Sequence, residues 1–284
     1  MQGGQLIVYF DTNVFDHLEK LSGVTAWDVF RVKRAVKLGY IRLVLSYLNI
    51  EETLFIVSSR PKRAEAQVGL IFELADKHLV ARGHQLIINN DIRAYAEGVP
   101  LQSPYESLTA WMESEIWRLV APVGSDINEL KSVVDETCRI KKEYQDFMVK
   151  GRKMLKPMAD SIGPRRYTFE SYWKANNGWL AEGLAKRARV LVKVKRRGVD
   201  GLLKVKSVAL AVGANLSLLY SHHFENRTPA SGDSRDILHV IAASSADIFV
   251  TNDKRLETAL SRIPVDGFQV MNLQVFLNSL PTWI

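Results

Sequence analysis

Apolar and polar residues alternate in blocks along the first ninety residues and again near the end of the chain. Short runs rich in apolar and β-branched residues predict strands at 6–10, 41–46, 85–89, 247–252 and 268–272. Between them, apolar residues recur at helical spacing and predict helices over 14–22, 25–38, 47–57, 61–79, 234–246 and 254–263. Continuously apolar strands that are separated by helices are typical of a parallel sheet covered on both faces.

The middle of the chain has a different pattern. Residues 91–230 are mostly helical in periodicity and contain several chain-breaking stretches, such as VPLQSP and SIGPRR. We therefore predict an α/β core made of residues 1–90 and 231–284, with residues 91–230 as a large helical insertion.

Acidic residues follow two of the predicted strands. Asp11 comes directly after the strand at 6–10, and Asp253 follows the strand at 247–252. In an open parallel sheet, ligands bind at the carboxyl ends of the strands, so both side chains are expected in one crevice. Asp236, in the first turn of a predicted helix, and Glu52, in the helix after the second strand, are placed to reach it too.

Several carboxylates at one point repel one another unless a cation joins them. Carboxylate oxygens suit Mg²⁺ or Mn²⁺, and such ions can activate a water for attack on a phosphodiester. His222 and His223 are adjacent, which is not a typical ligand spacing, and the sequence has no glycine-rich phosphate loop.

Four stretches that carry these acids resemble the motifs of the PIN-domain nuclease family: YFDTNVF, NIEETL, GDSRDILHVIAAS and ADIFVTNDKRL. The resemblance covers about residues 5–90 and 230–275. It implies a three-layer α/β/α sandwich with a central parallel sheet of five strands.

The resemblance also implies a function. Asp11, Glu52, Asp236 and Asp253 would hold one or two Mg²⁺ or Mn²⁺ ions and serve catalysis. The implied reaction is endonucleolytic cleavage of RNA, ahead of DNA, by a metal-activated water. Residues expected to orient a carboxylate or to bind substrate are Asn13, Thr251 and Asn252.

Two alternatives to this function stay open. Many small members of the family are toxins, which would give this chain an antitoxin or another regulatory protein as partner, although its long middle segment departs from them. The other alternative is a scaffold that binds nucleic acid without cleaving it. A homodimer is also left open.

Each candidate ligand has a simpler structural reading. Asp11 could cap the following helix, and Asp253 could belong to a turn. Asp233 is predicted as the N-cap of the helix at 234–246, so Asp236 in its first turn could merely interact favourably with the helix dipole. Glu51 is the alternative to Glu52, which shares a helix face with apolar neighbours. His239, on the same helix as Asp236, is interpreted as a packed, hydrogen-bonded histidine rather than a ligand.

The net charge of +7 and the isoelectric point of about 9.4 favour a polyanionic partner. Nine basic residues fall between Lys186 and Lys206 against one acid, Asp200. The residues predicted to contact phosphates are Lys193, Lys195, Arg196 and Arg197. Basic and aromatic residues just before this run could bind a single-stranded nucleic acid, although core packing is the favoured interpretation of the aromatic ones. These residues are Arg165, Arg166, Tyr167, Tyr172, Trp173 and Trp179.

The sequence has no stretch apolar enough to span a bilayer and no pattern typical of a signal peptide. Its one cysteine, Cys138, cannot form an internal disulfide, in agreement with a reducing compartment. A cytoplasmic protein with no membrane partner is therefore expected.

Overall fold

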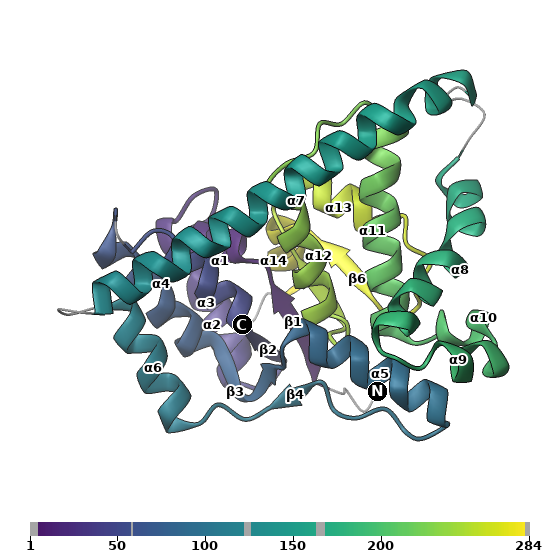
Figure 1. Cartoon of the computed structure of the whole chain (residues 1–284). Coiled ribbons are helices and arrows are strands. Elements are labelled where there is room, and N and C mark those ends of the chain that lie inside the picture. Colours follow the sequence, from purple (N-terminus) through teal and green to yellow (C-terminus); the bar gives the residue numbers. More distant parts are fainter. Residues whose placement is uncertain (1–4, 58, 122–125, 163–167, 282–284) are drawn as a thin grey trace.

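The computed structural model describes residues 5–57, 59–121, 126–162 and 168–281. Within these residues, six strands form one sheet in the order β4-β3-β2-β1-β5-β6 (Figure 1). Five strands are parallel and β4 is antiparallel to β3. The strands are β1 (Leu6–Phe10), β2 (Ile41–Ser46), β3 (Ala75–Ala81), β4 (Tyr105–Glu106), β5 (Ile248–Val250) and β6 (Gln269–Met271).

Helices connect the strands and fill the middle of the chain. Those that precede β4 in sequence are α1 (Thr12–Lys20), α2 (Ala26–Lys37), α3 (Tyr47–Leu54), α4 (Pro61–Leu74) and α5 (His84–Glu97). Those between β4 and β5 are α6 (Ala110–Val120), α7 (Asp126–Ile162), α8 (Phe169–Arg187), α9 (Leu191–Arg197), α10 (Val199–Leu202), α11 (Lys206–Phe224) and α12 (Asp233–Ala242). The last two are α13 (Lys254–Ser261) and α14 (Leu273–Ser279).

The side chains of β1 show how the sheet is covered. Tyr9 points into a core that includes residues of α5, α8, α11 and α12. Val8 and Phe10 point to the opposite face, into a core with α1, α4 and α14. Successive residues of a strand face opposite sides, so a central strand with helices on both faces is apolar throughout. The fold is α/β and compatible with three α/β/α layers.

The helices between β4 and α12 share one core with the sheet. Helix α11 is almost wholly buried, and it packs against α8, α12, α13 and α5. Gly213 of α11 permits one of these contacts, because a Cβ there would lie 2.4 Å from a methyl carbon of Ile263. No helix in the described part of the chain, α11 included, has the length and apolarity needed to cross a membrane.

Two predictions about the first half of the sheet are wrong. Residues 85–89 lie in helix α5, for which Gly83 is the N-cap and whose buried apolar residues face one side. The third parallel strand is β3, at 75–81, which was predicted as the end of the 61–79 helix. The sheet also has six strands rather than five, since the two-residue β4 pairs with the edge of β3.

Candidate metal centre

The order of the strands reverses between β1 and β5, and the candidate acids gather at that point. Asp11 directly follows β1, and its N–H donates to the Val250 carbonyl oxygen at the end of β5 (3.0 Å). Asp253 lies three residues beyond Val250. A reversal of strand order opens a crevice at the carboxyl ends of the strands, where ligands of α/β proteins bind.

Hydrogen bonds fix the Asp11 carboxylate, which is only 7% exposed. Its Oδ1 accepts from the Thr12 N–H (2.7 Å), and its Oδ2 accepts from Asn13 Nδ2 (2.6 Å) and Thr251 Oγ1 (2.8 Å). Asn13 Oδ1 in turn accepts from the Asn252 N–H (3.0 Å). Asn13 and Thr251 therefore orient a carboxylate and join the ends of β1 and β5.

Helix α3 brings Glu52 to the same place. It starts without a loop after β2, and Ser46 is both the last residue of the strand and the cap that accepts from the Leu48 N–H (3.2 Å). Glu52 faces Asp11 one and a half turns later, whereas Glu51 points away and pairs with Arg235. The side chain of Glu51 is also more exposed, 48% against 21% for Glu52.

Helix α12 supplies two more polar groups, Asp236 and His239, which lie one turn apart on the same side. His239 is 1% exposed, and its Nδ1 lies 2.6 Å from the Tyr9 hydroxyl. Its Nε2 lies 3.3 Å from Glu52 Oε2 and 3.9 Å from Asp11 Oδ1. Despite this closeness, Nε2 has no partner with the geometry of a hydrogen bond. A buried nitrogen is thus aimed at two carboxylates without a bond to either.

The three side chains fit a single cation. Ligand atoms of Asp11, Glu52 and His239 all lie within 4.8 Å of one another. Two ligands on a Mg²⁺- or Mn²⁺-sized ion, each about 2.1 Å from it, are at most about 4.2 Å apart, so small side-chain rotations close the site. Two carboxylates with one imidazole favour Mn²⁺ over Mg²⁺, because imidazole suits the transition metals. We call this set the acid–histidine cluster.

Asp236 and Asp253 lie near the acid–histidine cluster but outside it. Burial, followed by the charge of Asp11, raises the pKa of Asp236 to about 8 although its side chain keeps some exposure. Asp253 also contributes to this rise. The Oδ1 of Asp253 caps α13 by accepting from the N–H groups of Arg255 (2.7 Å) and Leu256 (3.2 Å), a structural role other than the turn position considered for it from the sequence.

The pKa values of the three residues in the cluster depend on burial and on the interaction of His239 with the two carboxylates. Burial works against ionisation of Glu52, but the close approach of His239 lowers its pKa to about 2. Burial likewise opposes a charge on His239, but Glu52 and Asp11 together raise its pKa. Burial raises the pKa of Asp11, against the opposing effect of His239. His239 and the two carboxylates thus stabilise one another's charged forms at the place where a bound cation would lie.

Three residues of this site were not among the metal ligands and substrate contacts predicted from the sequence. His239 and Tyr9 form the hydrogen-bonded pair described above. Asn49 is fully buried on α3, and its Nδ2 donates to the Phe10 carbonyl oxygen and to Thr12 Oγ1, both at 3.1 Å. The spacing of Asp236 and His239 by one helical turn is the sequence signal that could have indicated the histidine.

The prediction that Asp233 is the N-cap of α12 is wrong. The cap is Gly232, and Asp233 is the first helical residue. Its buried carboxylate pairs with Arg227, accepts from the Ala230 N–H (3.0 Å) and lies 3.0 Å from His222 Nε2. This second cluster holds the loop between α11 and α12.

The predicted phosphate contacts Lys193, Lys195 and Arg197 pair with groups away from the acid–histidine cluster. Lys193 pairs with Glu97 (3.3 Å), and Arg197 lies over the Tyr95 ring, both near the carboxyl end of α5. The 14-residue α5 is about 20 Å long, and its other end faces the cluster side of the molecule. Lys195 pairs with Glu182 (2.9 Å) on α8. Phosphate binding by Lys193, Lys195, Arg196 and Arg197 stays a prediction.

Of the aromatic and basic residues before this run, Tyr172 and Trp173 pack against the core, and Trp179 is 70% exposed. The remaining three, Arg165, Arg166 and Tyr167, lie outside the described residues.

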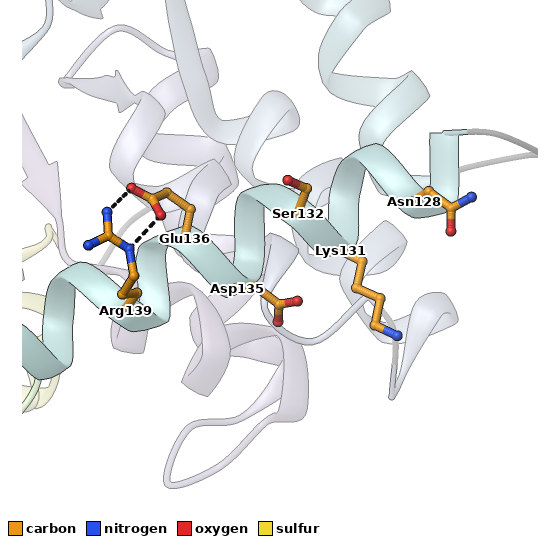
Figure 2. Close-up of a pocket in the computed structure, with 6 residues that line it drawn as sticks. All are labelled: Asn128, Lys131, Ser132, Asp135, Glu136 and Arg139. Carbon is orange, nitrogen blue, oxygen red and sulfur yellow. Dashed lines mark hydrogen bonds and ion pairs between the residues drawn. The ribbon is translucent and has the colours of Figure 1, made fainter.

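A hollow on the outer side of α7 is not a site of the same kind. Figure 2 shows that its six lining side chains all come from this one helix, with Arg139 bonded to Glu136 through two of its nitrogens. No other element closes it, so it offers a ligand only an open helix face.

Comparisons of the chain with models of protein families, with curated proteins and with solved structures gave no match. The relation to the PIN-domain family, the antitoxin partner and the homodimer are therefore predictions from the sequence.

Proposed function

We propose that the protein is a metal-dependent nuclease of PIN-like type that hydrolyses phosphodiester bonds, in RNA ahead of DNA, with Mn²⁺ or Mg²⁺ as cofactor. The observation that carries this proposal is the buried acid–histidine cluster at the reversal of strand order. Its unbonded His239 nitrogen lies within 4.8 Å of the ligand oxygens of Asp11 and Glu52.

A cation bound there would lower the pKa of a water and stabilise the charge that develops on the phosphate. Asp11 and Glu52 would hold the ion, with Asp11 kept in one orientation by Asn13 and Thr251. Asp236 is the candidate base, since a pKa of about 8 suits proton transfer near neutral pH. Asp253 would add negative charge while it caps α13.

The decisive experiment is cleavage of labelled single-stranded RNA and DNA in Mn²⁺, Mg²⁺ or EDTA by the wild type and two variants. Asp11→Asn and Asp236→Asn are each expected to abolish cleavage and to leave the circular dichroism spectrum unchanged. Asp146→Asn on the exposed face of α7 is the matched control and should cleave like the wild type. Folded Asp11→Asn protein that cleaves at the wild-type rate would refute the proposal.

A different negative result would favour the binding scaffold. Tight nucleic-acid binding by both the wild type and Asp11→Asn, without cleavage in any metal, would show that the site is not catalytic.

A further inference from the structure

A cavity of about 400 Å³ is lined by Glu51 and Leu238, the sequence neighbours of Glu52 and His239 in the acid–histidine cluster. Its walls come from the β2–α3 junction, the β3–α5 junction, α7 and α12. Ser46 ends β2 and Ala81 ends β3, so the cavity opens at the same sheet edge as Asp11. The volume lies in the range of about 300–1,000 Å³ that is usual for small-molecule sites. We call it the cationic cavity.

Three basic side chains, those of Arg82, Lys141 and Arg235, line this cavity against one carboxylate, Glu51. Glu51 is already paired with Arg235. Arg82 has a single long ion pair, 4.0 Å from Nε to Glu106 Oε2, and this buried Nε has no hydrogen-bond partner. The cavity therefore has positive charge that the protein does not neutralise.

Lys141 lies where the cavity meets the acid–histidine cluster. Its ammonium is half-buried, 4.2 Å from the centre of the Phe55 ring. No carboxylate in the described part of the chain lies within ion-pair distance of it. Burial lowers the pKa of Lys141, against the opposing effect of Glu52, which places this lysine within the field of the cluster. A desolvated ammonium without a carboxylate is suited to an anionic ligand.

Much of the remaining wall is apolar, although Ser46, His84, Thr137 and Ser234 also line it. Tyr47, Leu48 and Leu238 line it, together with Ile140 and Ala242. Such a surface matches the face of a flat aromatic ring, while the cations match a phosphate. The combination is that of a nucleotide, with the base on the apolar wall and the phosphate on the basic groups.

A second cavity, of about 260 Å³, continues from the first and shares His84, Ser234 and Leu238 with it. It extends to Tyr144 and Arg187, so a further aromatic ring and a further cation follow in line. Two adjoining cavities with this repeated chemistry suit two consecutive nucleotides of one strand.

We propose that the cationic cavity binds one unpaired nucleotide of the substrate strand, next to the phosphate held at the acid–histidine cluster. This inference rests on the proposed nuclease function and specifies its substrate as single-stranded. A base inside a duplex cannot enter a cavity walled by four segments of the protein, so paired substrates would have to open first.

The test is binding of a short fluorescein-labelled single-stranded RNA, and of the same RNA annealed to its complement, by fluorescence anisotropy in EDTA. Lys141→Gln and Arg82→Gln are compared with Lys142→Gln on α7 and Arg93→Gln on α5, which remove exposed cations. Thr137→Trp, at the α7 side of the wall, fills the cavity from the surface and removes no charge.

We expect Lys141→Gln and Arg82→Gln each to weaken single-strand binding by about five- to twentyfold and to reduce the salt slope by about one. Thr137→Trp should weaken it by at least about fivefold, and the two exposed-site controls by less than about twofold. The duplex should bind at least about tenfold more weakly than the single strand.

Equal effects of Lys141→Gln and Lys142→Gln, duplex binding as tight as single-strand binding, or no measurable binding would each overturn the inference. Because binding is measured without metal, the two proposals fail separately. If Lys141→Gln and Arg82→Gln cleave like the wild type, only the proposal for the cationic cavity is refuted. If binding depends on Lys141 and Arg82 but no cleavage occurs, only the proposed nuclease activity is refuted.

Discussion

Replacing Asp236 by asparagine should make the metal-free protein more stable at alkaline pH, although the same change is expected to abolish cleavage. Burial and the neighbouring charge of Asp11 raise the pKa of Asp236 to about 8, from an ordinary value of 3.8. In the unfolded chain, this carboxyl releases its proton near 3.8. Between these two values the folded protein binds the extra proton, so the free energy of unfolding falls as the pH rises.

The size of the effect follows from the gap between the two pKa values. From 3.8 to pH 7 is about three pH units, each worth about 1.4 kcal/mol. Ionisation of this carboxyl in the unfolded chain alone therefore lowers the free energy of unfolding by at most about 4 kcal/mol at pH 7. The loss is complete above about pH 8. The raised pKa values of Asp11 and His239 act in the same direction, because both groups also hold protons longer in the folded state. Comparison with a variant of Asp236 isolates the part of this pH-dependent change in the free energy of unfolding that comes from Asp236.

The assay is urea unfolding at pH 5 and pH 8 in EDTA, repeated with Mn²⁺. Between these pH values, wild-type stability should fall by about 2 to 4 kcal/mol more than that of Asp236→Asn. Mn²⁺ should then stabilise the wild type more than the variant, since it neutralises the carboxylates. Asp146→Asn, the exposed control, should follow the wild type. The reasoning is refuted if wild type and Asp236→Asn lose the same stability.

Three further variants test His239, its partner Tyr9, and the ion pair of Arg227 with Asp233. His239→Gln should weaken Mn²⁺ binding by at least about tenfold and Mg²⁺ binding by less, measured by calorimetric titration; equal losses would exclude a ligand role. Tyr9→Phe removes the hydroxyl that lies 2.6 Å from His239 Nδ1. It should lower the free energy of unfolding in urea by about 1 kcal/mol and the Mn²⁺ affinity by about tenfold, and unchanged metal binding would contradict a positioning role for Tyr9. Arg227→Gln leaves the buried Asp233 with less compensation and should cost about 2 to 4 kcal/mol, whereas the exposed Arg93→Gln should cost less than about 0.5 kcal/mol.

The central strands and their acids could be predicted because their environment is simple. Strand β1 is covered on both faces, so LIVYF is apolar throughout, and Asp11 follows at the point where the chain meets the crevice. The face of α3 that carries Glu52 could be inferred from helical spacing, and the structure turns that residue, not Glu51, toward Asp11.

The parts that were missed depend on contacts between distant segments. Strand β3 begins directly after α4 without a turn residue, and its first half carries the exposed Lys77 and His78, so no apolar run marks it. The position of His239 depends on Tyr9 and Glu52, which lie about 230 and 190 residues away along the chain. The cationic cavity has four separate segments as walls, and no local pattern encodes such a set.

The central position of β1 has a consequence for how the protein is made. One edge of β1 pairs with β2, as in Leu6 with Ile41, 35 positions later, but the other pairs with β5, as in Phe10 with Val250, 240 positions later. At translation rates of about 5–20 residues per second, that apolar edge waits on the order of 10 to 50 seconds for its partner. An open apolar edge is a template for wrong pairing, so the nascent chain is expected to need a chaperone during this interval. The same delay leaves Asp11 and Glu52 without His239 of α12 until about 190 further residues have been made, so the acid–histidine cluster forms late in the synthesis of this stretch.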